Sequence, residues 1–170
     1  MRVYLVGFMG AGKTTIGYQL SRALSMPFID LDQYIIDQEK QSVQEIFEQY
    51  GEDHFRELEK KALHSTFKVS NAIISTGGGL PCFFNNIDQM NKNGMTFYLK
   101  LPQEVILKRL IKSMRERPLV KDKTEEELKE TIHNLFESRR KYYEKAHYSV
   151  DAANKNALHY ITRILSGYMH

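Results

Sequence analysis

Short runs of apolar, β-branched and aromatic residues recur along the chain, separated by longer stretches rich in polar residues. Short apolar runs of this kind predict buried strands. In the stretches between them, apolar residues recur at three- and four-residue spacing, which predicts amphipathic helices. The alternation of strand and helix favours parallel βαβ units with helices on both faces of one sheet, an α/β domain. The predicted strands are residues 3–6, 28–30, 72–75, 95–99 and 148–150.

Local signals predict where several helices begin and end. The first helix follows residue 12 and ends before Pro27, which precedes the second strand. Ser42-x-x-Glu45 has the spacing of a capping box and predicts a helix start, and Gly51 predicts a break before a second helix from about residue 52 toward 67. Further helices are predicted after Pro102 and near the end of the chain.

A complete G-x-x-x-x-G-K-[ST] pattern occupies residues 7–14, directly after the first strand and before the first helix. Its glycines let backbone N–H groups converge on an anion at a helix N-terminus, where Lys13 reaches the outer phosphates and the Thr14 hydroxyl binds Mg²⁺. A glycine-rich turn without a ligand is the alternative, but the match in strand, loop and helix order favours a nucleoside triphosphate site. The expected nucleotide-binding residues are Gly10, Ala11, Gly12, Lys13, Thr14 and Thr15.

The composition of the chain limits the class of protein and the cellular compartment to which this site can belong. The 170 residues are 42% hydrophobic and 26% charged, typical of one globular domain. The net charge is +3 and the basic residues are dispersed, so no nucleic-acid surface is expected. The first apolar run leads into Lys13, unlike a signal peptide or a membrane span, and the single cysteine, Cys82, excludes an intrachain disulfide. We expect a cytoplasmic protein.

Polar and glycine-rich segments follow two of the predicted strands. Because the carboxyl ends of parallel strands meet at one edge of a sheet, these segments should lie near the phosphate loop. Asp30 and Asp32 end the second strand, and their spacing predicts carboxylates on one side of an extended segment. Capping of a helix by Asp32 is the alternative. Gly77, Gly78 and Gly79 end the third strand and predict either a close approach to a ligand or a plain turn.

Four arginines are candidates for anion binding, although most arginines are simply solvated. Arg56 has a local argument, because Glu59 lies one helical turn later and could fix the guanidinium. The charged stretch 113–124 lies between two predicted helices and is a candidate lid. The candidate arginines are Arg56, Arg109, Arg117 and Arg139.

Taken together, these motifs resemble the shikimate kinase family in family order from residue 2 to about residue 151. The resemblance implies a three-layer α/β/α P-loop kinase fold, with a five-stranded parallel sheet of order 2-3-1-4-5 and a mobile lid at about 113–124. It implies one domain over residues 1–170, with a substrate-binding helical segment at about 32–60. The matching segments are residues 7–17, Asp30-x-Asp32, Phe55-Arg56-x-x-Glu59, Thr76-Gly77-Gly78-Gly79, Arg117-Pro118-Leu119 and Arg139 ahead of Tyr142-Tyr143.

The family pattern implies transfer of the γ-phosphoryl group of ATP to the 3-hydroxyl of shikimate, in the biosynthesis of chorismate and the aromatic amino acids. On the donor side, it implies that Lys13 and Arg117 stabilise charge on the moving phosphoryl group. Thr14 would bind Mg²⁺ directly and Asp30 through water. Arg109 is the best match for an arginine that covers the adenine.

On the acceptor side, the resemblance implies that Asp32 holds the substrate hydroxyls and serves as the base. Arg56 and Arg139 would clamp the substrate carboxylate, with help from the backbone of Gly78 and Gly79. The implied enzyme needs shikimate, ATP and Mg²⁺. We expect it to act as a monomer with no nucleic acid, membrane or obligate protein partner.

Two other classes of function remain as alternatives. A gluconate or nucleoside monophosphate kinase would share the phosphate loop and lid, but would not require the paired arginines with the Asp-x-Asp and triple-glycine segments. A small GTPase would need D-x-x-G and N-K-x-D motifs. Neither motif occurs in the chain. The two segments that begin with Asn-Lys, residues 91–94 and 154–157, both lack the aspartate of N-K-x-D.

Overall fold

The computed structural model describes residues 1–115 and 124–168. Strands and helices alternate along most of this length, as the hydrophobic pattern predicts. The strands are β1 (Arg2–Val6), β2 (Phe28–Asp30), β3 (Ala72–Ser75), β4 (Met95–Lys100) and β5 (Tyr148–Asp151). The helices are α1 (Lys13–Leu24), α2 (Leu31–Glu39), α3 (Val43–Thr66), α4 (Asn86–Asn93), α5 (Gln103–Arg115), α6 (Glu125–Tyr143) and α7 (Ala157–Ser166), with a 3-10 turn, η1, at Leu80–Cys82.

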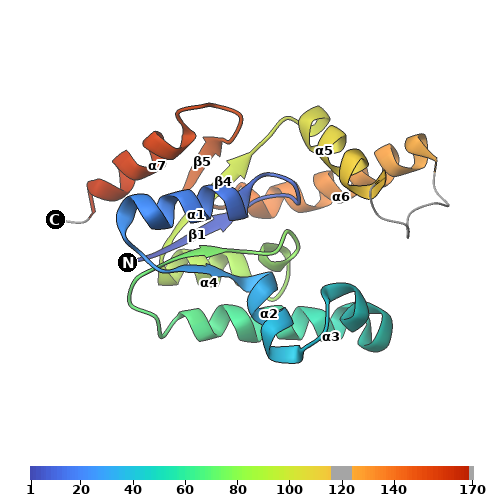
Figure 1. The fold of residues 1–170 in the computed structure, drawn as a ribbon, viewed down its shortest axis with the longest axis horizontal. Helices are drawn as coiled ribbons and strands as arrows, with labels where there is room; N and C mark the ends of the chain where they lie inside the picture. Colours follow the sequence, from blue (N-terminus) through green and yellow to red (C-terminus); the bar gives the residue numbers. More distant parts are fainter. Residues whose placement is uncertain (116–123, 169–170) are drawn as a thin grey trace.

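The five strands form one sheet of order β2-β3-β1-β4-β5, and every adjacent pair is parallel. Helices cover both faces of the sheet, giving three layers (Figure 1). On one face α1 packs beside α7, and on the other α4 packs against β4 and η1. The predicted α/β class and strand order are therefore confirmed. Within the described ranges, no helix has the length and apolar character needed to cross a bilayer.

Burial explains why the central strands are almost wholly apolar. A parallel sheet with helices on both faces has no solvent-facing side, so residues of both orientations must suit the interior. In β1 the side chains from Val3 to Val6 are fully buried, and so are Ile73 and Ile74 of β3. The carboxyl ends of β1, β2 and β3 then lead into the phosphate loop, the aspartate pair and the glycine segment, respectively. The buried core thus brings three separate sequence motifs to one edge.

The long helix α3 carries Arg56, the first of the four candidate arginines, toward that edge. Its capping box is present: the Glu45 N–H donates to Ser42 Oγ at 3.2 Å, and the Ser42 N–H donates to Glu45 Oε2 at 2.7 Å. Gly51 interrupts the helix with φ 82° and ψ 172°, so α3 consists of two helical pieces that meet at a kink. The start at Ser42 and the break at Gly51 both agree with the sequence prediction.

Candidate active site

The phosphate loop joins β1 to α1 and leaves the start of α1 available for an anion. Gly12 occupies the N-cap position with φ 91°, and it has no side chain to occupy the N–H groups of the first turn. Lys13 is only 8% exposed, and its ammonium group donates to the carbonyls of Gly7 at 2.7 Å and Phe8 at 2.9 Å. A buried ammonium group and a helix N-terminus thus face the same space, which is the arrangement that binds phosphate.

Arg109 reaches this loop from α5. Its Nη1 donates to the carbonyl of Gly10 at 2.8 Å, across 99 residues of sequence. The structure therefore brings this predicted arginine to the phosphate loop.

The aspartate pair lies across from Lys13, but not in the predicted geometry. β2 ends at Asp30 and α2 begins at Leu31, so the expectation of two carboxylates on one side of an extended segment is wrong. Asp30, rather than Asp32, is the helix cap: its Oδ1 accepts from the N–H groups of Asp32 at 3.1 Å and Gln33 at 3.3 Å. The physical reason is that a carboxylate at the strand end satisfies the free N–H groups of α2, so the chain turns at once into helix.

Both aspartates nevertheless face the phosphate loop. The Thr14 hydroxyl donates to Asp30 Oδ2 at 2.8 Å, which links the first turn of α1 to the end of β2. Asp30 and Asp32 line a pocket of about 340 Å³ together with Lys13, Thr14, Thr76 and Gly78. The pocket therefore joins the phosphate loop, the aspartate pair and the glycine segment in one cavity.

Arg56 lies beside this pocket in an unusually confined position. It is 6% exposed, and its Nη1 donates to Glu59 Oε2 at 2.6 Å, as the sequence spacing predicts. Its Nε and Nη2 donate to Glu52 Oε1 at 3.1 and 2.9 Å. The Phe83 ring lies 4.4 Å from the guanidinium carbon, within the range of a cation–π contact. Ion pairs and aromatic packing thus fix the guanidinium plane.

The triple glycine provides the room for these side chains. A Cβ atom at Gly79 would lie 2.4 Å from Arg56 Nη1, and one at Gly77 would lie 2.6 Å from Asp32 Oδ1. Either distance is far inside van der Waals contact, so any larger residue would displace a predicted site residue. The glycine segment is therefore more than a turn, because it lets the backbone approach both charged groups closely.

Arg139 approaches the same segment from α6. Its guanidinium carbon lies 5.9 Å from the centre of the Phe8 ring in the phosphate loop, and a Cβ atom at Gly78 would lie 3.5 Å from its Nη1. Arg56 and Arg139 thus border the glycine segment at Gly79 and Gly78. Arg117 and residues 116–123 of the predicted lid lie outside the described residues.

Burial shifts the acid–base properties of three groups in the site. It lowers the pKa of Lys13 to about 8, although Asp32 and Asp30 act in the opposite direction. Burial raises the pKa of Asp32, and the negative charge of Asp30 adds to that effect while Lys13 and Arg56 oppose it. Burial also raises the pKa of Glu59 to about 7 against the opposing charge of Arg56. Carboxylates and cations are therefore held close together out of bulk water.

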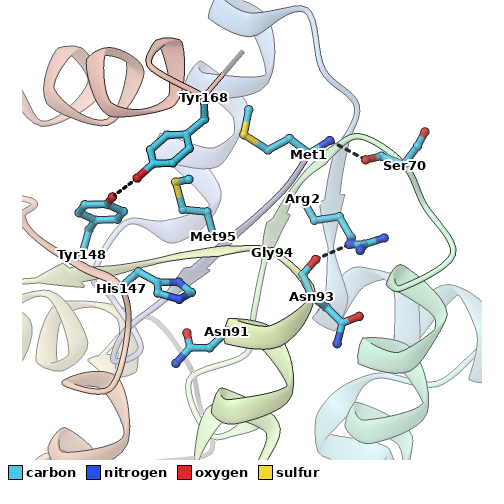
Figure 2. A pocket seen from close by; sticks show the side chains of 10 residues that line it. All are labelled: Met1, Arg2, Ser70, Asn91, Asn93, Gly94, Met95, His147, Tyr148 and Tyr168. Carbon is cyan, nitrogen blue, oxygen red and sulfur yellow. Dashed lines mark hydrogen bonds between the residues drawn. The ribbon is translucent and has the colours of Figure 1, made fainter. Parts of the chain in front are cut away.

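A second cavity lies at the opposite, amino-terminal edge of the sheet (Figure 2). Its volume is about 640 Å³, larger than that of the pocket at the phosphate loop. Its lining includes Arg2, Gly94, Met95, Tyr148 and Tyr168, and it contains none of the predicted site residues. A third cavity of about 670 Å³ is lined in part by Thr14, Asp30 and Asp32, so size does not separate the two edges of the sheet. The convergence of charged groups at the carboxyl edge does.

A phosphate loop at the carboxyl edge of a parallel 2-3-1-4-5 sheet, facing buried acidic and basic side chains, defines a P-loop kinase. Deoxyadenosine kinase from M. mycoides with bound dATP shares this fold, with a TM-score of 0.63 at 20% identity over 98% of this chain and 100% of that one. The family model for shikimate kinase matches residues 9–168. The chain belongs to the shikimate kinase family.

Individual relatives agree with this assignment. Shikimate kinase from Parabacteroides distasonis is 45% identical over 151 residues, which cover 89% of this chain and 87% of the relative. The crystal structure of shikimate kinase from Bacteroides thetaiotaomicron has a TM-score of 0.87 at 38% identity, covering 99% and 98% of the two chains. The enzyme from Acinetobacter baumannii, in complex with shikimate, has a TM-score of 0.85 at 32% identity, covering 99% and 95%. The predicted family and kinase class are confirmed.

The low pKa of Lys13 makes the stability of the unliganded protein depend on pH. Below pH 8 the ammonium group is charged in both folded and unfolded chains, and its burial costs the most. As the pH rises from about 8 toward 10.5, the folded protein loses this proton first, so the cost disappears. Relative to Lys13→Met, the wild type should therefore gain roughly 1–3 kcal/mol of unfolding free energy between about pH 8 and pH 10.

Urea unfolding of both proteins at several pH values checks this expectation. The buffers should be free of phosphate and sulfate, since either anion would bind at the loop and restore the charged form. A constant difference between the two proteins across this range would show that the buried ammonium group keeps its ordinary pKa.

Proposed function

We propose that this chain transfers the γ-phosphoryl group of ATP to the 3-hydroxyl of shikimate, giving shikimate 3-phosphate and ADP. One observation carries the proposal. The buried ammonium group of Lys13 shares a pocket with Asp32, while Arg56 and Arg139 border the glycine segment next to that pocket. A phosphoryl donor, a hydroxyl acceptor and a carboxylate could each find complementary groups here.

The donor half of the site is the phosphate loop. Backbone N–H groups of Gly10, Ala11, Gly12 and Thr15 would hold the β- and γ-phosphates, and Lys13 would stabilise the charge on the transferred group. The ammonium group of Lys13 donates to two carbonyls of the loop, so it is directed toward the loop before a nucleotide binds. Arg109, beside Gly10, would cover the adenine.

P-loop kinases generally need a divalent metal, and the oxygen donors near the loop suit Mg²⁺. The hydrogen bond between Thr14 and Asp30 shows that a hydroxyl and a carboxylate share one small space there. Thr14 would bind the ion directly and Asp30 through water. The ion would compensate the charge of the β- and γ-phosphates.

The acceptor half is made by Asp32 and the two arginines. Asp32 would accept hydrogen bonds from the substrate hydroxyls and take the proton of the attacking one, and its raised pKa makes its carboxylate a stronger base. Arg56 and Arg139 would clamp the shikimate carboxylate, with the N–H groups of Gly78 and Gly79. Catalysis would then consist mainly of alignment and charge compensation.

Other features of the proposal concern organisation rather than chemistry. Residues 1–170 would act as one domain, with the substrate-binding segment at about 32–60 formed by α2 and most of α3. We infer a cytoplasmic monomer that acts without nucleic acid or an obligate protein partner. Arg117 keeps its expected role as a second cation on the phosphoryl group, although it lies outside the described residues.

A coupled ADP-release assay with Mg²⁺ tests the proposed reaction. Shikimate should support turnover. Nucleoside monophosphates should not, because they carry no carboxylate for the arginine pair, and neither should gluconate, because its open chain does not fix the distance between its carboxylate and its hydroxyls. Lys13→Met should lower the rate at least about 100-fold, since a fixed cation at the transferring group is lost. Turnover confined to gluconate or to a nucleotide would refute the proposal.

Adjacent arginines on α6 allow a matched test of the carboxylate clamp. Arg139 faces the glycine segment, whereas Arg140 forms exposed ion pairs with Glu137 and Glu144. Arg139→Ala should raise the KM for shikimate about 10- to 100-fold, the effect expected for loss of a charge-assisted contact. Arg140→Ala should leave it within about twofold. Equal KM values for shikimate in the two variants would show that Arg139 does not bind the substrate carboxylate.

A further inference from the structure

Tyr143, near the end of α6, is a buried phenol whose hydroxyl contacts the glycine segment. Its side chain is 0% exposed, and the hydroxyl donates to the carbonyl of Gly78 at 2.6 Å, across 65 residues of sequence. A carbonyl oxygen only accepts hydrogen bonds, so the single hydroxyl proton is committed to Gly78. The lone pairs of the phenol oxygen therefore remain for a donor.

Arg139 lies on the same helix and borders the same glycine. It precedes Tyr143 by four positions on α6, so the two side chains lie on the same face of the helix. Burial raises the pKa of Tyr143 well above its usual range, and the nearby positive charge of Arg139 partly offsets that effect. Arg139 also lies beside Gly78, where a Cβ atom would be 3.5 Å from its Nη1. The hydroxyl of Tyr143 and the guanidinium of Arg139 thus meet at Gly78.

Packing fixes the position of Tyr143 and of this face of α6. The Tyr143 ring lies against Tyr98 of β4, with 5.4 Å between ring centres. Two turns earlier on α6, Phe136 makes an edge contact with Phe8 of the phosphate loop, also at 5.4 Å. The face of α6 that carries Arg139 is therefore attached to the sheet, the phosphate loop and the glycine segment together.

We propose that Tyr143 is a positioning residue for the acceptor site, whose hydroxyl sets the distance between the Arg139 guanidinium and the main chain of Gly78. This inference rests on the proposed function, in which both groups bind the substrate carboxylate. Tyr143 itself does not touch the substrate. Without the hydroxyl, the ring still packs against Tyr98, but the two halves of the carboxylate site are no longer tied to each other.

The variant Tyr143→Phe tests this role, and Tyr4→Phe is its matched control. Tyr4 is also 0% exposed, and its hydroxyl is hydrogen-bonded to Thr66 at 3.0 Å, toward the amino-terminal edge of the sheet. Both changes remove one buried hydroxyl and keep the ring. A general loss of stability should therefore appear in both variants, whereas a change in shikimate binding should appear in one.

Calorimetry with shikimate, and steady-state kinetics with shikimate and ATP, give the two readouts. Tyr143→Phe should weaken shikimate binding and raise its KM by about three- to tenfold, the range for loss of one hydrogen bond, while the KM for ATP stays within about twofold. Tyr4→Phe should change neither constant. Wild-type shikimate affinity in Tyr143→Phe, or equal increases in both KM values, would overturn the inference. Absence of shikimate binding by the wild type would instead refute the proposed function.

Discussion

The site depends on one constraint: the charged groups at the carboxyl edge of the sheet are removed from water and must be matched by one another. Lys13 and Arg56 are almost fully buried, and so is Glu59. An isolated buried charge is very costly, so each of these groups requires partners at hydrogen-bond distance. Lys13 finds them in two loop carbonyls, and Arg56 finds them in Glu52 and Glu59. The hydrogen bonds and ion pairs that allow the sheet edge to fold are therefore the same ones that balance the charges of the site.

This constraint also explains how the site would work. Cations that are fixed before a substrate arrives need little reorganisation when negative charge develops on a phosphoryl group. The same pairing that makes burial tolerable holds the guanidinium of Arg56 in one plane and the ammonium group of Lys13 at the loop. The glycines contribute by letting backbone and charged side chains approach closely, since a Cβ atom at Gly77 or Gly79 would displace Asp32 or Arg56.

Local sequence signals predicted most of the fold, because each depends on residues close together in the chain. The phosphate loop, the Ser42 capping box, the break at Gly51 and the Arg56–Glu59 pair all have this character. The prediction of an extended segment through Asp30 and Asp32 was wrong, because the sequence pattern does not show that Asp30 caps α2 directly after the strand. The short, polar α4 was not predicted at all, since its few apolar residues give little periodicity. Contacts such as Phe83 with Arg56, or Tyr143 with Gly78, join distant segments and leave no local signal.

A crystal structure with ADP, Mg²⁺ and shikimate would test the central claim most directly. The account predicts phosphates on the N–H groups at the start of α1, and the shikimate carboxylate between Arg56 and Arg139. It also predicts a ring hydroxyl within hydrogen-bond distance of Asp32, facing the phosphate loop. A carboxylate bound away from both arginines, or a hydroxyl directed away from Asp32, would contradict the account.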